Sequence, residues 1–133
     1  CIVKIICLEG PNNIGKTTAI NEVYNIIAQC NCKEIKQKEQ VGKELQDFKA
    51  EIECYQNDST LKKIAFYSMG DEANKVLEVI SYYLTDGSFD YLIIANREFK
   101  TVRKEILKNQ ESIILTNKET FSKDVLRELM III

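Results

Sequence analysis

Apolar and polar residues follow one another along the chain in blocks that predict regular secondary structure. The run from Ile2 to Leu8 is almost entirely apolar and rich in β-branched residues, which is typical of a central parallel strand covered on both faces. From Lys16 to Cys30 apolar residues recur every three or four positions, which predicts an amphipathic helix. Tyr91 to Ala95 again has the pattern of a buried strand.

The middle of the chain predicts a β-hairpin preceded by a polar segment. Phe48 to Tyr55 alternates apolar and charged residues, as a half-buried strand does, and Lys63 to Ser68 reads as a second strand. Asn57-Asp58-Ser59 between them is a turn signal. The segment from Lys33 to Asp47 is dominated by Lys, Glu and Gln, and we expect a solvated helix or a mobile connection there.

The second half of the chain alternates helices and strands. An apolar stripe after Gly70 predicts a helix that ends at Asp86-Gly87, and a short helix is expected from Phe99. Ser112 to Leu115 is the last predicted strand, and Ser122 to Ile133 the last helix. Such alternation predicts an α/β fold, with a mostly parallel sheet flanked by helices on both faces. The hairpin is expected to add one antiparallel strand at an edge.

Composition and charge restrict the class of protein to which the chain can belong. With 133 residues, 45% hydrophobic and 29% charged, the chain fits a single globular domain spanning residues 1–133. Its apolar runs are far shorter than the ~20 residues that cross a bilayer, so we expect no membrane partner. The net charge is -2 with both signs interspersed, which does not support nucleic acid as a partner. No feature of the sequence identifies a protein partner.

The cysteines predict a cytoplasmic location. Five cysteines cannot all pair, and we interpret Cys1, Cys7 and Cys54 as small buried apolar residues in a reducing cytosol. Cys30 and Cys32 are too closely spaced for a usual zinc site, and the chain has no histidine to complete one. Without histidine, acid–base chemistry has to come from carboxylates, Lys, Tyr or water.

The segment from Gly10 to Thr17 matches the pattern G-x-x-x-x-G-K-[ST], and it stands between a predicted buried strand and a predicted helix. Glycines allow the tight backbone turn, and successive N–H groups at a helix start favour an anion. Lys16 can reach phosphate oxygens, and the Thr17 hydroxyl can bind Mg²⁺. The predicted phosphate-binding residues are Gly10, Asn12, Asn13, Ile14, Gly15, Lys16, Thr17 and Thr18.

With Glu9 in front of it, this segment resembles the P-loop NTPase superfamily, and most of all thymidylate kinase and related nucleoside or nucleotide kinases. The resemblance is confined to about residues 2–20. It implies a P-loop fold, ATP as the nucleotide and Mg²⁺ as the cofactor. Where these kinases have an Asp-Arg pair after a central strand, this chain has Asn96-Arg97, and it has no counterpart of their arginine-rich lid.

Further candidates follow the predicted strands. Asp71 could hold Mg²⁺ through a water and Glu72 could polarise an attacking water, but both residue types also suit a helix start. Glu9 and Asp90 are the next carboxylates to consider. Arg97 could contact a phosphate or, alternatively, form a surface salt bridge.

One further segment bears on the choice of base. Asn117-Lys118-Glu119-Thr120 partly resembles the guanine-reading N-K-x-D of GTPases, but Thr120 lacks the carboxylate, so GTP is not predicted.

Taken together, these residues predict a small Mg²⁺-dependent nucleoside triphosphatase that transfers a phosphoryl group to water. Its catalytic residues would be Lys16, Glu72 and Arg97, and its metal site Thr17 and Asp71. Two alternatives stay open at this point. One is a kinase-like phosphotransferase acting on a nucleoside or nucleotide, and the other is a non-catalytic module whose conformation depends on the bound nucleotide.

Overall fold

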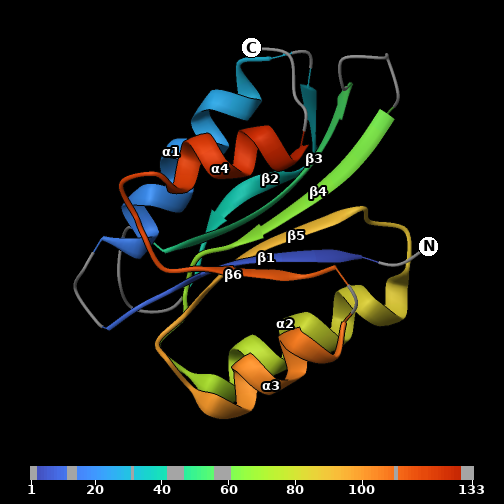
Figure 1. The fold of residues 1–133 in the computed structure, drawn as a ribbon. Coiled ribbons are helices and arrows are strands. Elements are labelled where there is room, and N and C mark those ends of the chain that lie inside the picture. The colour runs from blue at the N-terminus through green and yellow to red at the C-terminus, as the bar shows by residue number, and fades with distance from the viewer. Residues whose placement is uncertain are drawn as a thin grey trace.

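A computed structural model describes residues 3–11, 15–30, 32–41, 47–55, 61–109 and 111–129. In these residues six strands form one sheet, in the order β2-β3-β4-β5-β1-β6, and four helices cover it (Figure 1). The strands are β1 Lys4–Glu9, β2 Cys32–Gln40, β3 Phe48–Tyr55, β4 Leu61–Tyr67, β5 Tyr91–Asn96 and β6 Ile113–Leu115. The helices are α1 Lys16–Ala28, α2 Ala73–Asp86, α3 Lys100–Lys108 and α4 Phe121–Leu129.

The sheet carries an apolar core on each face. Helices α1 and α4 pack on one face and α2 and α3 on the other (Figure 1). Along β1, Ile6 and Leu8 belong to the first core, and Ile5 and Cys7 to the second. Since successive side chains of a strand point to opposite faces, a strand buried on both sides needs an unbroken apolar run. The α/β class and the helices on both faces are confirmed.

The sheet is mixed. Strand β1 lies between β5 and β6 and is parallel to both, and β4 is parallel to β5. Strand β3 is antiparallel to β4, as the hairpin pattern predicts, and β2 is antiparallel to β3. Of the five strand pairings in the described residues three are parallel and two are antiparallel, and the expectation that the antiparallel strand of the hairpin lies at an edge is wrong. Strand β3 is internal, and β2 forms the edge.

Strand β2 replaces the solvated helix or mobile connection expected over Lys33 to Asp47. Every residue of β2 after Cys32 is exposed, so the strand has no buried face and no apolar alternation to reveal it. Backbone pairing with β3 holds it, and cross-strand ion pairs line it. These pairs are Lys33 with Glu53, Lys36 with Glu51 and Lys49 with Glu39.

A disulfide joins Cys32 of β2 to Cys54 of β3, which face each other across the two strands. Cys54 is therefore wrongly interpreted from the sequence as a free thiol, whereas Cys7 is buried and unpaired as expected. Cys30 is a half-buried free thiol. Disulfides are rare in reducing compartments, so this bond counts against the argument for a cytoplasmic location, which stays a prediction.

The remaining elements begin and end within two residues of the sequence predictions wherever the structure describes them. Helix α4 is described as far as Leu129, and Met130 to Ile133 and the Asn57-Asp58-Ser59 turn lie outside the described residues. Among the described helices, none combines the length and the apolar character needed to cross a membrane.

Candidate functional site

The strands β1, β4 and β5 run parallel, so their carboxyl ends lie on the same side of the sheet. We call this side the carboxyl edge. The chain leaves β1 for α1 on one face and leaves β5 for α3 on the other. In open α/β sheets, ligands bind in the crevice that such diverging connections leave. The two strand ends are joined where the Gly10 N–H donates to the Asn96 carbonyl oxygen at 3.1 Å. Strand β3 runs the opposite way, so its amino end reaches the same edge.

The start of α1 lies at this edge. Gly15 precedes the helix with a φ of 88°, a left-handed conformation that favours glycine, and no side chain caps the first turn. The residue before the helix thus offers no side-chain acceptor to the first N–H groups, and no acidic residue lies in that turn. Asn12, Asn13 and Ile14, which the sequence also predicts as phosphate ligands, lie outside the described residues.

Lys16 is buried with 6% of its surface exposed. Its ammonium donates to the carbonyl oxygens of Gly10 at 3.1 Å and Pro11 at 2.7 Å, so the side chain folds back along the loop. Thr18, two residues on, is exposed. A cation held by backbone carbonyls at a helix start is well placed to meet an anion.

The charges that face Lys16 come from the other strand ends. Burial lowers the pKa of Lys16, the carboxylate of Asp71 opposes this effect, Arg97 adds to it and Glu98 opposes it. Asp71 follows β4, and Arg97 and Glu98 follow β5. Asp71 and Arg97, both predicted from the sequence as site residues, thus act electrostatically on the same lysine. Glu98 was not predicted, and its φ of 60° is an uncommon conformation for a residue with a side chain.

Asp47 is a site residue that sequence reasoning missed. It lies directly before β3, is 5% exposed, and its Oδ1 accepts a hydrogen bond from the Thr17 hydroxyl at 2.6 Å. The Ser68 hydroxyl donates to the same oxygen at 3.4 Å. The only signal in the sequence is an acidic residue immediately before a predicted strand, inside a run of other charges. A buried carboxylate beside a threonine hydroxyl is an oxygen-rich arrangement that suits Mg²⁺.

A cavity of about 540 Å³ opens beside this pair. It lies between the first turns of α1, the end of β2 and the start of β3. Its lining residues are Thr17, Thr18, Asn21, Lys38, Glu39, Gln40, Asp47 and Phe48. The unpredicted edge strand therefore forms one wall of the space next to Thr17.

Asp71 and Glu72 do not cap α2 with their side chains. The capping position is Glu72, which is exposed and makes no side-chain hydrogen bond to the helix, and Asp71 stands one residue earlier. The alternative that Asp71 is a helix cap is therefore wrong. Gly70 sets the position of Asp71, because a Cβ there would lie 2.7 Å from the carbonyl carbon of Ala95.

Arg97 is exposed, and within the described residues it forms no ion pair, so the salt bridge offered as the alternative is not seen there. Its backbone N–H donates to the Gly70 carbonyl oxygen at 3.1 Å, which ties the turn after β5 to the turn after β4. An exposed guanidinium at this edge can contact an anionic group.

Glu9 and Asp90, the further carboxylate candidates, have other partners. Glu9 is 3% exposed, forms an ion pair with Arg103 and accepts a hydrogen bond from the Asn96 amide at 2.8 Å. An aspartate at position 96 would place a second carboxylate against Glu9, which gives a physical reason for asparagine there. Asp90 lies at the opposite edge of the sheet, where its carbonyl oxygen accepts from the Lys4 N–H at the start of β1 and its carboxylate accepts from the Lys63 N–H at 3.0 Å.

Lys118 lies beside the start of α1. Its Nζ is 3.6 Å from the position that a Cβ on Gly15 would occupy, so the loop after β6 reaches the residue that precedes α1. In the ranges that the structure describes, no cluster of three or more His, Cys, Asp or Glu side chains could by itself hold a metal ion.

Comparison with protein-family models, with curated proteins and with solved structures finds no match to this chain. The function is therefore inferred from the side chains that the fold gathers at the carboxyl edge.

Proposed function

We propose that the protein binds a nucleoside triphosphate, ATP in the first instance, with Mg²⁺, and transfers its γ-phosphoryl group to water. The observation that carries this proposal is the Thr17 hydroxyl, 2.6 Å from the buried Asp47 carboxylate at the start of α1. A glycine turn before a helix needs neither this hydroxyl nor this carboxylate. Together with Lys16 they supply a cation for phosphate and oxygen atoms for Mg²⁺.

Each residue then has a role set by its position. The N–H groups at the start of α1 and the Lys16 ammonium bind the phosphates, and Lys16 exchanges its carbonyl partners for phosphate oxygens. Thr17 and Asp47 hold Mg²⁺. Asp71, whose charge acts on Lys16, is the next carboxylate that could contribute to the metal site. Mg²⁺, when bound, neutralises part of the negative charge of the phosphates.

Arg97 and Glu72 act on the side of the crevice formed by β4 and β5. Arg97 is exposed beside the charges around Lys16, where a guanidinium can stabilise the phosphoryl group as negative charge develops on its oxygens. Glu72 is exposed at the start of α2 and would accept a proton from the attacking water.

The test combines binding with turnover. At a hundredfold excess over Kd, Mg·ATP should stabilise the protein by ~2.7 kcal/mol, and Lys16→Ala should abolish most of that without unfolding the chain. Phosphate release should accompany binding and stop in Arg97→Ala, which still binds ATP. The absence of any shift with ATP, GTP or ADP at millimolar concentration would refute nucleotide binding.

Two other outcomes would change the proposed reaction but leave the proposed nucleotide site in place. Transfer of phosphate to an added nucleoside or nucleoside monophosphate, in place of release, would identify a kinase. Binding of ATP with no turnover at all would identify a module that responds to the nucleotide.

A further inference from the structure

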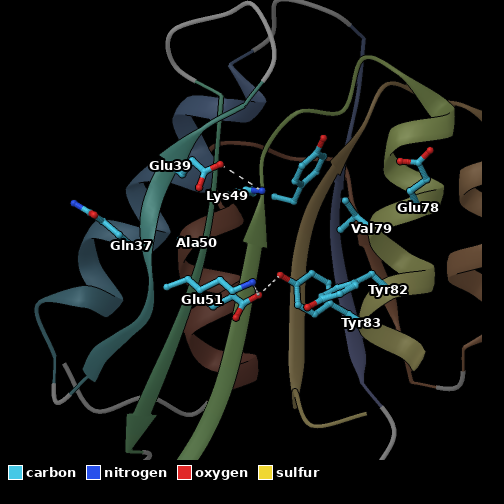
Figure 2. Close-up of a pocket in the computed structure, with 11 residues that line it drawn as sticks. Gln37, Glu39, Lys49, Ala50, Glu51, Glu78, Val79, Tyr82 and Tyr83 are labelled. Atoms are coloured by element: carbon cyan, nitrogen blue, oxygen red, sulfur yellow. Dashed lines mark hydrogen bonds and ion pairs between the residues drawn. The ribbon is translucent and has the colours of Figure 1, made fainter. Parts of the chain in front are cut away.

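A second cavity, of about 490 Å³, lies on the opposite face of the sheet from α1. Figure 2 shows it between the hairpin strands and α2, with Glu39, Lys49 and Glu51 on the strand side and Glu78, Tyr82 and Tyr83 on the helix side. No residue of this cavity except Glu39 lines the cavity beside Thr17. It is therefore a separate space, which the proposed phosphoryl chemistry does not use.

Glu51 forms the floor of this cavity. It is 7% exposed, and within the described residues the only hydrogen bond to its carboxylate comes from the Tyr83 hydroxyl at 2.6 Å. Lys36 stands 3.9 Å away, which makes an ion pair but is beyond a good hydrogen bond. A buried carboxylate can accept about four hydrogen bonds, so Glu51 keeps unused acceptor capacity toward the cavity.

The pairing of Lys36 with Glu51 shows that the Glu51 carboxylate attracts an ammonium group. Lys36 is an alkylammonium that lines the cavity, its side chain is 66% exposed, and it is the basic group paired with Glu51. With 3.9 Å between the charged groups and its lysine mostly in water, this ion pair contributes little to stability. A ligand cation can therefore displace Lys36 into water and reach the carboxylate more closely.

The walls favour a cation with an apolar body. The rings of Tyr67, Tyr82 and Tyr83 and the side chain of Val79 line the cavity, and Tyr82 and Tyr83 stand edge to face, 4.9 Å between ring centroids. Ring faces attract cations, and they pack against flat or aliphatic groups.

The remaining charges disfavour an anion. Lys49 is paired with Glu39 at 3.4 Å, and Glu78 adds a carboxylate from α2. Burial raises the pKa of Tyr67 and the carboxylates of Glu72, Asp47 and Glu78 raise it further, which indicates a negative field at this wall. A phosphate or carboxylate ligand would meet that field in a lining where three carboxylates outnumber two lysines.

We propose that this cavity binds a small organic cation, an amine carrying an aromatic or aliphatic body, whose ammonium pairs with Glu51 while its body packs on Tyr82 and Tyr83. The site is independent of the nucleotide and is tested without it.

The test uses three probes that share one ring and differ in charge: benzylamine, benzyl alcohol and benzoate. The chain has six tyrosines and no tryptophan, and three of the tyrosines line the cavity, so tyrosine fluorescence reports binding directly. We expect benzylamine to bind with a dissociation constant on the order of millimolar, as so small a probe allows. Benzyl alcohol should bind about tenfold more weakly, since it lacks the charge-assisted hydrogen bond, and benzoate should not bind.

Two variants locate the site. Glu51→Gln keeps the shape and an acceptor oxygen, and should weaken benzylamine about tenfold while leaving benzyl alcohol unchanged. Glu53→Gln is the matched control, because Glu53 lies on the same strand and face, pairs with Lys33 and does not line the cavity. Tyr82→Leu, at an exposed position, should weaken benzylamine about two- to fivefold through the lost ring face.

Several results would overturn the proposal. These are equal binding of benzylamine and benzyl alcohol, preference for benzoate, no saturable binding of benzylamine, or a Glu51→Gln variant that binds benzylamine like the original chain. If Glu51→Gln fails to fold, Tyr82→Leu decides, and unchanged benzylamine binding in that variant rejects the site.

Discussion

Replacing Asp47 by asparagine removes one charge from the candidate metal site and changes little else. Asparagine has the size of aspartate and keeps an oxygen that can accept from the Thr17 and Ser68 hydroxyls. Exchanging a charge-assisted hydrogen bond for a neutral one costs about 1 kcal/mol, so the variant should stay folded with a melting temperature only a few degrees lower.

The effect on Mg²⁺ should be much larger than the effect on stability. An Mg²⁺ ion bound to the Thr17 oxygen at about 2.1 Å lies no farther than about 4.7 Å from Asp47 Oδ1, because these two oxygens are 2.6 Å apart. Even with the full screening of water, a divalent ion and a unit charge at that distance attract by about 1.8 kcal/mol. The Mg²⁺ concentration for half-maximal activity should therefore rise about twentyfold or more.

The assay is phosphate release from ATP against Mg²⁺ concentration, with melting temperature measured on the same samples. Asp90→Asn is the matched control, since it makes the same chemical change at the start of a strand on the opposite edge of the sheet. We expect its Mg²⁺ curve to follow that of the original chain. If the Asp47→Asn curve also superimposes on the original, Asp47 does not hold the ion and the reasoning fails.

Three further predictions concern the loop, the turn after β4 and the disulfide. Because burial lowers the pKa of Lys16, Mg²⁺-free ADP should begin to bind more weakly at a pH below the ordinary 10.5, as the ammonium loses its proton, and calorimetry should find no such dependence in Lys16→Met. Gly70→Ala should cost about 1–3 kcal/mol in chemical denaturation, because its Cβ would meet the Ala95 backbone, and an unchanged midpoint would contradict that contact. Reducing the bond between Cys32 and Cys54, which are 22 residues apart, should lower the free energy of unfolding by about 3 kcal/mol, measured with and without a thiol reductant.

The sequence predicts well those elements whose side chains are buried in a regular pattern. The apolar run of β1 and the helical stripe of α1 reflect burial that the fold provides, so both were placed correctly. Strand β2 shows no pattern of buried apolar residues in its sequence. It is exposed along its length, and backbone pairing and charges on the neighbouring strand hold it in place. Its polar residues look the same as those of a solvated helix.

In the candidate site too, some residues could be predicted from the sequence and others could not. Gly15, Lys16 and Thr17 are close together in the sequence, so their spacing could carry the prediction. Asp47 reaches Thr17 only because β3 runs antiparallel and brings its amino end to the carboxyl edge, and no local pattern reports that. The pairing of Cys32 with Cys54 likewise depends on the register of two strands, one of which was not predicted.

The central position of β1 has a consequence for the order in which the protein is assembled. β1 is the first described strand, yet its neighbours β5 and β6 come from the last third of the chain. Contacts between residues so far apart in sequence form slowly, because a long loop has to close first. On the ribosome, which delivers the chain from its amino end, Gly10 cannot meet Asn96 until β5 has emerged. The segment that joins β1 to α1 is thus made before β5 and acquires its final surroundings only after β5 has followed.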